Sequence, residues 1–226
     1  MSGAVDLAAE YVLLVLDDDK GGFRQDLTTV DFTVAAAALV QLARDGVLVL
    51  DDSAGGLPFF RRGDVPPADA LHEEIVTRAL GKSCDQAIAA LSSPFGRRPN
   101  TARALREHVL EKLVSAGVLR TDRERLLGLI PRTRYPQVDG TTEAALRERL
   151  GGVLHGAEPD EDSRVLITLL DAGHGLGRVF PGLDSAQLRR RGHELAEGSW
   201  AGKGLTMAFA QQAAYFAQVS TVGVGY

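Results

Sequence analysis

Two arginines, three residues apart, have the type and spacing best suited to a chemical role in this sequence. Arg103 and Arg106 lie in TARALREHVLEKLVSAGVL, residues 101–119, where apolar residues recur every three or four positions. This period predicts an amphipathic helix, and residues three apart share one of its faces. Paired guanidiniums bind oxyanions through forked, charge-assisted hydrogen bonds. The pair therefore indicates a surface that faces an anion.

The charge around the pair contrasts with the charge of the whole chain. The formal net charge is −5, yet residues 97–134 hold ten Arg or Lys against four Asp or Glu, a local balance of +6. The rest of the chain must then carry −11. Such a segment suits a phosphate headgroup or nucleic acid, although a solvated helical face is the alternative.

The remaining reactive residues do not form a catalytic set. The five histidines, at positions 72, 108, 155, 174 and 193, show no metal-ligand spacing, and DAGHGLG lacks the pattern of a phosphate loop. Cys84 has no basic neighbour in the sequence, so we expect an inert buried thiol. We expect His174 to lie at the end of a helix. The paired acids fall at turns and helix starts. We therefore expect no enzyme activity, no cofactor and no metal.

Composition and length predict a mainly α, single globular helical domain over residues 1–226, with a few short β-hairpins and a frayed tail from about residue 220. Hydrophobic residues make up 45% and aromatic residues 6% of the 226 residues, so Ala, Leu and Val must fill the core. One cysteine excludes an internal disulfide. The apolar stretches are shorter than the roughly 20 residues that cross a bilayer, and no secretory signal is visible.

Local signals place the individual elements. Asp31 and Gly46 are expected to cap and end a helix over residues 31–45, and Asn100 or Thr101 to cap the helix that carries the arginine pair. Short strands and turns follow both helices. Further helices are expected at residues 6–16, 69–80, 83–91, 141–154, 160–176, 184–196 and 205–219.

Several stretches together resemble the Golgi phosphoprotein 3 family, in particular its bacterial, actinobacterial members. They are LAAEYVLLVLDDDKGGF, LVQLARDGVLVLDD, RALREHVLEKLVSAGVL, LIPRTRYP and DSRVLITLLDAGHGLGRVF. Each is of modest specificity, but their order and spacing cover nearly the whole chain. The resemblance implies a helical fold and a peripheral membrane protein that binds phosphatidylinositol 4-phosphate.

The resemblance also implies which residues form the pocket. Two family arginines fall on Arg103 and Arg106, whereas a family Trp falls near Arg24 and a third arginine falls at about Ala35. Half of the pocket is therefore retained. Arg24 is expected to supply a guanidinium from its loop, with the loop FGRRP as a helper. Another anionic lipid or a phosphorylated ligand is an alternative to the phosphoinositide.

We therefore expect a non-catalytic protein that binds anionic phosphate through Arg103, Arg106 and Arg24. Its expected partner is an anionic phospholipid headgroup or membrane surface, and its expected place is the cytoplasm, peripheral at the inner face of the membrane. In the family the hairpin near Leu129–Tyr135 supports oligomer contacts and docking, so it is a candidate homo-oligomer contact; an ordinary packed hairpin is the alternative.

Two other function classes stay open at this stage. A winged-helix nucleic-acid-binding protein would place the arginine helix in a groove and the basic segment RTDRERLLGLIPRTR on the phosphate backbone. Glu107 and Glu111 on that helix, and the acidic chain, argue against nucleic acid. An enzyme acting on a phosphorylated molecule would need His108, which lies two residues from Arg106 and so faces away from it.

Overall fold

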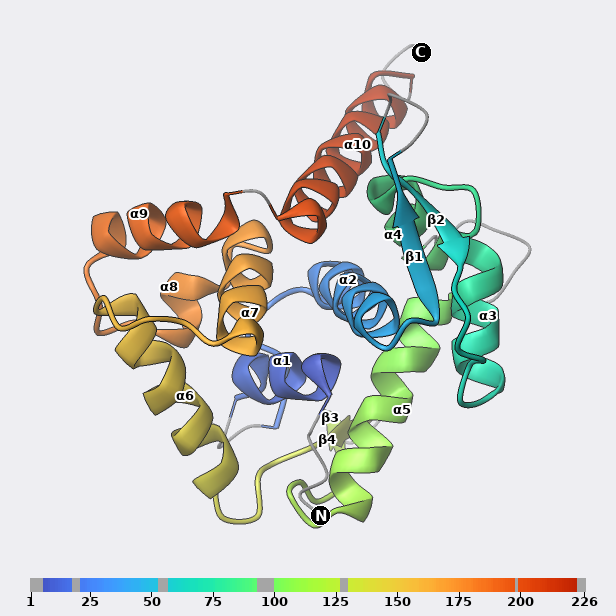
Figure 1. Cartoon of the computed structure of the whole chain (residues 1–226). Helices are drawn as coiled ribbons and strands as arrows, with labels where there is room; N and C mark the ends of the chain where they lie inside the picture. The colour runs from blue at the N-terminus through green and yellow to red at the C-terminus, as the bar shows by residue number, and fades with distance from the viewer. Residues whose placement is uncertain are drawn as a thin grey trace.

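The computed structural model describes residues 6–17, 21–52, 57–92, 100–126, 130–197 and 199–222, and the side chains of 125, 126, 130–132 and 213–222 are left undescribed. Within these ranges the chain forms ten helices and two antiparallel strand pairs, which confirms the helical domain (Figure 1). The expected frayed tail lies partly in 223–226, outside the described residues. The helices are α1 (Leu7–Val15), α2 (Leu27–Arg44), α3 (Ala70–Ala79), α4 (Cys84–Ser92), α5 (Thr101–Ser115), α6 (Thr141–Leu154), α7 (Glu161–Ala172), α8 (Leu176–Val179), α9 (Ser185–Ala196) and α10 (Trp200–Val222).

Helices α1 and α2 form the centre of the fold, and the other helices surround them (Figure 1). Alanines at 35, 36 and 37 of α2 are fully buried, and their small side chains let neighbouring helices approach closely. Among the described residues, α2 alone is long and apolar enough to cross a membrane by composition, but 67% of it is buried inside the protein. It serves here as a core helix.

The start of α2 differs from the sequence expectation. Its N-cap is Asp26, whose carboxylate accepts hydrogen bonds from the Thr29 backbone N–H at 2.9 Å and the Thr29 hydroxyl at 2.6 Å. The expected cap, Asp31, lies instead inside the helix, where it is 7% exposed. The prediction was wrong because Asp26 and Asp31 both precede apolar residues, and either could have been the cap by its residue type. Only Asp26 lies at the N-terminus of the helix.

Other helix ends agree with their local signals. Asp6, Asp69, Asn100, Asp160 and Asp184 cap α1, α3, α5, α7 and α9 with their side chains. Helix α10 begins at Trp200, earlier than expected, and it crosses α4 where Gly204 leaves no room for a Cβ beside Cys84. Gly202, two residues earlier, likewise lies so close to Thr168 of α7 that a Cβ would clash with its side chain.

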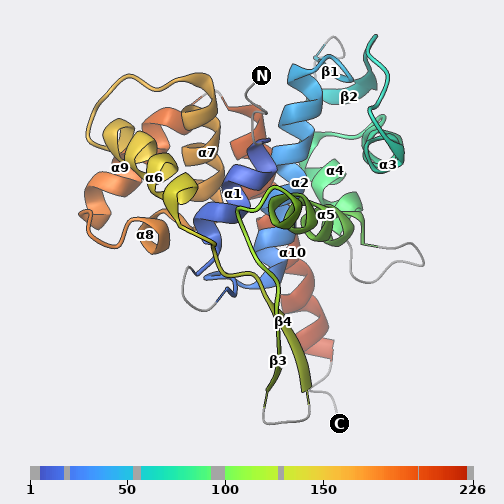
Figure 2. The same ribbon diagram turned by 90° about the horizontal axis from the view of Figure 1, so that it is seen from below.

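Two hairpins complete the fold. Strands β1 (Leu48–Asp51) and β2 (Phe59–Arg62) pair after α2, and β3 (Asp122–Leu126) and β4 (Ile130–Arg134) pair after α5. The β3–β4 hairpin projects from the body (Figure 2). At its base the Tyr135 N–H donates to the Gly21 carbonyl at 2.8 Å, which attaches it to the loop after α1. Gly21 has a φ of +57° and lies so close to Tyr135 and Pro136 that a Cβ would clash with their backbone nitrogens.

Candidate anion-binding site

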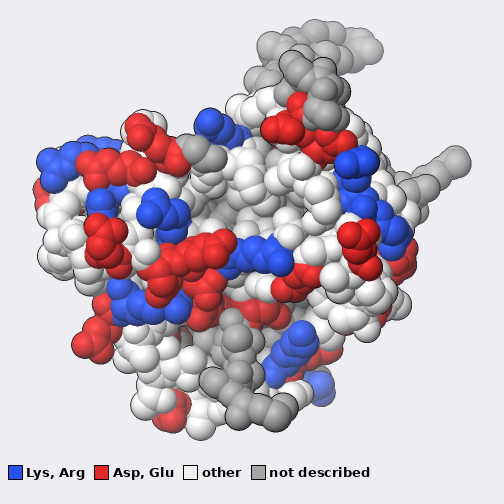
Figure 3. Space-filling view, viewed as in Figure 1, with Lys and Arg blue, Asp and Glu red and all other residues white. Residues whose placement is uncertain are grey.

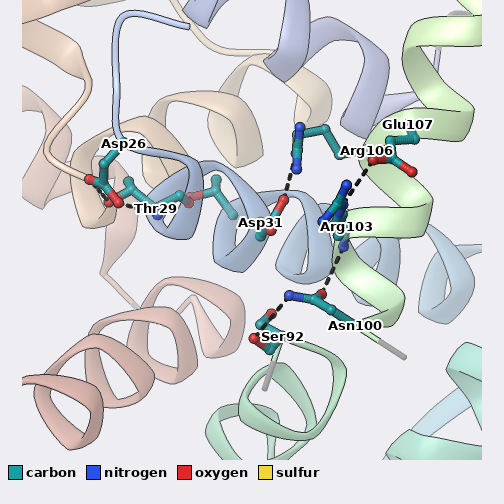
Figure 4. A network of polar contacts seen from close by, with 9 residues as sticks. Asp26, Thr29, Asp31, Ser92, Asn100, Arg103, Arg106 and Glu107 are labelled. Carbon is teal, nitrogen blue, oxygen red and sulfur yellow. Dashed lines mark hydrogen bonds and ion pairs between the residues drawn. The ribbon is translucent and has the colours of Figure 1, made fainter. Parts of the chain in front are cut away.

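Helix α5 presents Arg103 to solvent on its first turn. The helix starts where the Asn100 side chain accepts a hydrogen bond from the Arg103 N–H at 2.8 Å (Figure 4). The Arg103 side chain is 66% exposed, and its Nε lies 2.9 Å from Glu107 one turn along the helix. An exposed i,i+4 pair of this kind contributes only about 0.3–0.5 kcal/mol, so Arg103 can leave Glu107 at little cost.

Arg106 has the opposite environment. Its Nε lies 2.6 Å from the Asp31 carboxylate on α2, and the two residues are 8% and 7% exposed (Figure 4). The Phe23 ring lies 5.7 Å from the Arg106 guanidinium carbon, at cation–π distance. Arg106 is therefore the cation of a buried ion pair that joins α5 to α2.

Burial dominates the electrostatics of Asp31. Desolvation raises the pKa of this carboxyl above its ordinary value, and the hydrogen bond and charge of Arg106 oppose that rise without cancelling it. Arg103 also lowers the Asp31 pKa through its charge, whereas Glu107 raises it. Both arginines of the predicted pair therefore act on one carboxylate.

Arg24 lies in the loop between α1 and α2, next to Phe23. Its Nε donates to the Leu16 carbonyl at 2.8 Å, so its guanidinium is directed to the end of α1. Its own carbonyl accepts a hydrogen bond from Arg178 of α8 at 3.2 Å. The loop therefore contacts Arg106 through the Phe23 ring. The Arg24 side chain helps to hold the loop against the end of α1.

A buried polar chain fixes the next residue of the loop. The Tyr11 hydroxyl donates to Gln25 Oε1 at 2.7 Å, and Gln25 Nε2 donates to the Gly173 carbonyl at 2.8 Å. Tyr11 is fully buried, and this burial raises the pKa of its hydroxyl above the ordinary value, so it stays a hydrogen-bond donor. The loop that supports Arg106 is thus tied to α1 and to the end of α7.

Comparison with known proteins shows the family to which the chain belongs. A family model described as Golgi phosphoprotein 3 (GPP34) matches residues 7–212. The chain belongs to the Golgi phosphoprotein 3 family. A search of curated proteins finds no match. The matched range contains the loop, Asp31 and the whole of α5, so the site lies inside the family domain.

The third family arginine, which the resemblance places at about Ala35, does not carry over to this chain. Ala35 is fully buried in the middle of α2. One turn earlier, Asp31 contacts Arg106, so a carboxylate faces α5 from this part of α2. Sequence reasoning missed Asp31 as a site residue. The available signal was its position four residues before Ala35, which is one helical turn.

Several described bases of the segment 97–134 are paired with acids. Arg103 and Arg106 pair with Glu107 and Asp31, and Lys112 lies 3.7 Å from Asp6 of α1. The hairpin likewise contains the pairs Arg120–Asp122 and Arg134–Glu124, at 3.3 and 3.2 Å. The expected helper loop FGRRP lies outside the described residues. Of these acids only Asp31 and Asp6 lie outside the segment, so only these two reduce the local balance of +6 below its value along the sequence.

Other candidate chemistry stays separate from this site. Cys84 is buried, and desolvation raises its pKa to about 12, as expected for an inert thiol. His174 has a φ of +55° just after α7, in agreement with its expected helix-end position. In the part of the chain that the structure describes, no three His, Cys, Asp or Glu side chains could hold a metal ion.

A surface hollow of about 510 Å³ lies between α2, α7 and the start of α10, on a face where acidic and basic groups are interspersed (Figure 3). Arg44 at its edge is paired with Glu161 at 3.0 Å and Asp162 at 2.6 Å. Arg164 of α7 also lines the hollow, so basic and acidic side chains are mixed around it.

Proposed function

We propose that this protein binds an anionic phosphate headgroup, such as that of phosphatidylinositol 4-phosphate, and associates peripherally with a membrane in a non-catalytic role. One observation carries the proposal: α5 places a solvent-facing guanidinium, Arg103, one turn from a buried one, Arg106, that already binds an oxyanion. Membership of the Golgi phosphoprotein 3 family supports the same function.

The ion pair of Arg106 is a guide to what the site can bind. A guanidinium has five donors, and Asp31 occupies the Nε donor. A phosphate offers three terminal oxygens, so it can accept from Arg106 and from Arg103 together. Because Arg103 is two-thirds exposed and held by one surface acid, it is free to turn toward such a ligand.

The position of the site agrees with docking on a membrane surface. Arg106 contacts Phe23 of the loop after α1, and the same loop is attached to the base of the projecting β3–β4 hairpin. Headgroup site and hairpin thus share one connected region of the molecule (Figure 2). In this proposal the hairpin, expected as a contact between copies over Leu129–Tyr135, helps to dock the protein at the inner face of the membrane; Leu129 itself lies outside the described residues.

No observation on the described residues favours the winged-helix alternative. Helix α5 packs against α1, α2, α3 and α4, and its apolar stripe is buried in the core. Arg106, the second arginine of the would-be recognition helix, is engaged with Asp31 inside the protein.

Vesicle co-sedimentation tests the proposal. Vesicles of phosphatidylcholine, alone or with phosphatidylinositol 4-phosphate, are compared for the wild type, Arg103→Ala, Arg103→Ala/Arg106→Ala and a matched control, Arg190→Ala. Arg190 is 75% exposed and lies near Glu194 at i,i+4, so it reproduces the setting of Arg103 on another helix. We expect the phosphoinositide to increase binding, Arg103→Ala to weaken it and Arg190→Ala to leave it unchanged. Equal binding to both vesicle types, or equal binding by the two single variants, would overturn the proposal.

A further inference from the structure

A second hollow, of about 310 Å³, lies between α4, the first turns of α10 and the β1–β2 hairpin, and α5 contributes nothing to its lining. These elements are neighbours on one side of the fold (Figure 1). Leu50, Leu57 and Met207 form apolar walls, and both Leu57 and Met207 are exposed. Small-molecule pockets are mostly apolar, contain few polar groups and have volumes of about 300–1,000 Å³. The hollow therefore has the size and lining that suit one small molecule.

The single tryptophan of the chain, Trp200, belongs to the wall of this hollow. Its ring packs edge-on against the fully buried ring of Phe60, with 5.7 Å between the ring centroids. Gly204, one turn along α10, lies so close to Cys84 of α4 that a Cβ would clash with that side chain. These contacts fix α10 against α4 and the hairpin, so the apolar surface of the hollow is preformed.

Asp85 is the acidic group of the hollow, and it is 4% exposed. Its carboxylate accepts hydrogen bonds from the Ser83 hydroxyl at 2.5 Å and from the Gln211 side-chain amide at 2.7 Å. Both donors are neutral, and the N-terminus of α4, where Asp85 lies, offsets only roughly half an elementary charge. A carboxylate has about four acceptor positions, so Asp85 can accept further hydrogen bonds from a cation.

Lys203 is the basic group of the same hollow. It is exposed and lies on the first turn of α10. Among the described residues, neither Lys203 nor Asp85 forms an ion pair, with each other or with another side chain. Two opposite charges that line one hollow without pairing are complemented by a ligand that carries both charges.

We propose that this hollow binds a free apolar α-amino acid. The ammonium group pairs with Asp85, the carboxylate pairs with Lys203, and the side chain lies against Trp200 and Met207. An anion alone would meet the charge of Asp85, and a cation alone would meet the charge of Lys203. A residue inside a peptide lacks both charges, so the ligand is the free amino acid. This inference does not depend on the proposed function.

L-Leucine is the probe, and its binding is measured by the fluorescence of Trp200 and by isothermal titration calorimetry. Isocaproate is leucine without the amine, isoamylamine is leucine without the carboxylate, and glycine has both charges without an apolar side chain. We expect leucine to bind at least about tenfold more tightly than each of these three, since a charge-assisted hydrogen bond or a buried apolar side chain contributes about this factor.

Two variants each remove one charge from the hollow and keep the approximate shape of the side chain, Asp85→Asn and Lys203→Met. The matched control is Lys112→Met, which makes the same change on α5, where Lys112 lies 3.7 Å from Asp6. We expect each hollow variant to weaken leucine binding about tenfold and the control to leave it unchanged. Lys203→Met should bind isoamylamine no more weakly than the wild type does, because that ligand has no carboxylate. Circular dichroism checks each fold.

The absence of a saturable response to leucine in either measurement would overturn the inference. An analogue that binds as tightly as leucine would also overturn it, as would a folded hollow variant with the wild-type affinity for leucine. If Asp85→Asn does not fold, Lys203→Met decides alone, because Lys203 is exposed. These variants keep Arg103 and Arg106, so failure here leaves the vesicle test of the proposed function unaffected.

Discussion

Removing either member of the Arg106–Asp31 pair should destabilise the fold strongly. The loss should be larger when the other member of the pair is still present. Each residue is less than a tenth exposed, and the interacting atoms are 2.6 Å apart. Removal of one member of a buried pair leaves an uncompensated charge and typically costs about 3–5 kcal/mol. We expect Asp31→Ala and Arg106→Ala each to lower the free energy of unfolding by about this amount.

The double variant should cost clearly less than the sum of the two single variants. With charge centres roughly 4 Å apart and an effective dielectric constant of about 20, the attraction is about 4 kcal/mol before desolvation is subtracted. A coupling free energy of about 2–3 kcal/mol is therefore expected. Urea unfolding measures it, followed by circular dichroism and by the fluorescence of Trp200, which packs edge-on against buried Phe60 at 5.7 Å.

The dependence on pH has a defined sign. Without Arg106, the Asp31 carboxyl loses its cation, so its pKa in the folded state rises further above the unfolded value. A raised pKa means that the folded state binds the proton more tightly, and stability is gained as pH falls through the folded pKa. The deficit of Arg106→Ala relative to the wild type should therefore shrink in mild acid. A coupling free energy below about 0.5 kcal/mol between the two substitutions would refute the reasoning. A stability deficit of Arg106→Ala that grows in acid would refute it as well.

Three further variants or treatments probe other features. Arg103→Ala should change the free energy of unfolding by no more than about 0.5 kcal/mol in a urea titration, because its pair with Glu107 is exposed. Iodoacetamide at pH 8 should modify Cys84 about a hundredfold or more slowly in the folded protein than in denaturant, as judged by mass spectrometry, because burial raises its pKa to about 12. Gly204→Ala should cost about 1–3 kcal/mol in thermal unfolding, since its Cβ would lie within 2.5 Å of the Cys84 Cβ; an unchanged midpoint would contradict the close packing of α4 and α10.

Features set by short stretches of sequence could be predicted well. Asn100 caps α5 as expected, and Gly117 follows that helix with a φ of +74°. Both signals act within a few residues, so the sequence contains all that is needed to recognise them. The i,i+3 spacing of Arg103 and Arg106 likewise places them on one helix face wherever the helix packs.

Features that depend on distant contacts could not be predicted in the same way. Asp31 was expected as a helix cap, and its partner Arg106 lies 75 residues further on. The Arg178 side chain donates to the carbonyl of Arg24, 154 residues earlier, and so holds the loop that carries this expected pocket residue. In both cases the contact joins residues that only the fold brings close together. The local sequence pattern therefore could not predict it.

The buried hydrogen bond from Gln25 to Gly173 has a consequence for the order of events during synthesis. Its partners are 148 residues apart, and the adjacent bond from Arg178 to the Arg24 carbonyl spans 154. On a ribosome, α1 and α2 emerge long before the chain that must hold the loop between them. The loop beside Arg106 can take its final position only after α7 and α8 have left the exit tunnel. A nascent chain that stops before α7 would therefore carry Arg103 and Arg106 and still lack the contacts that hold this loop.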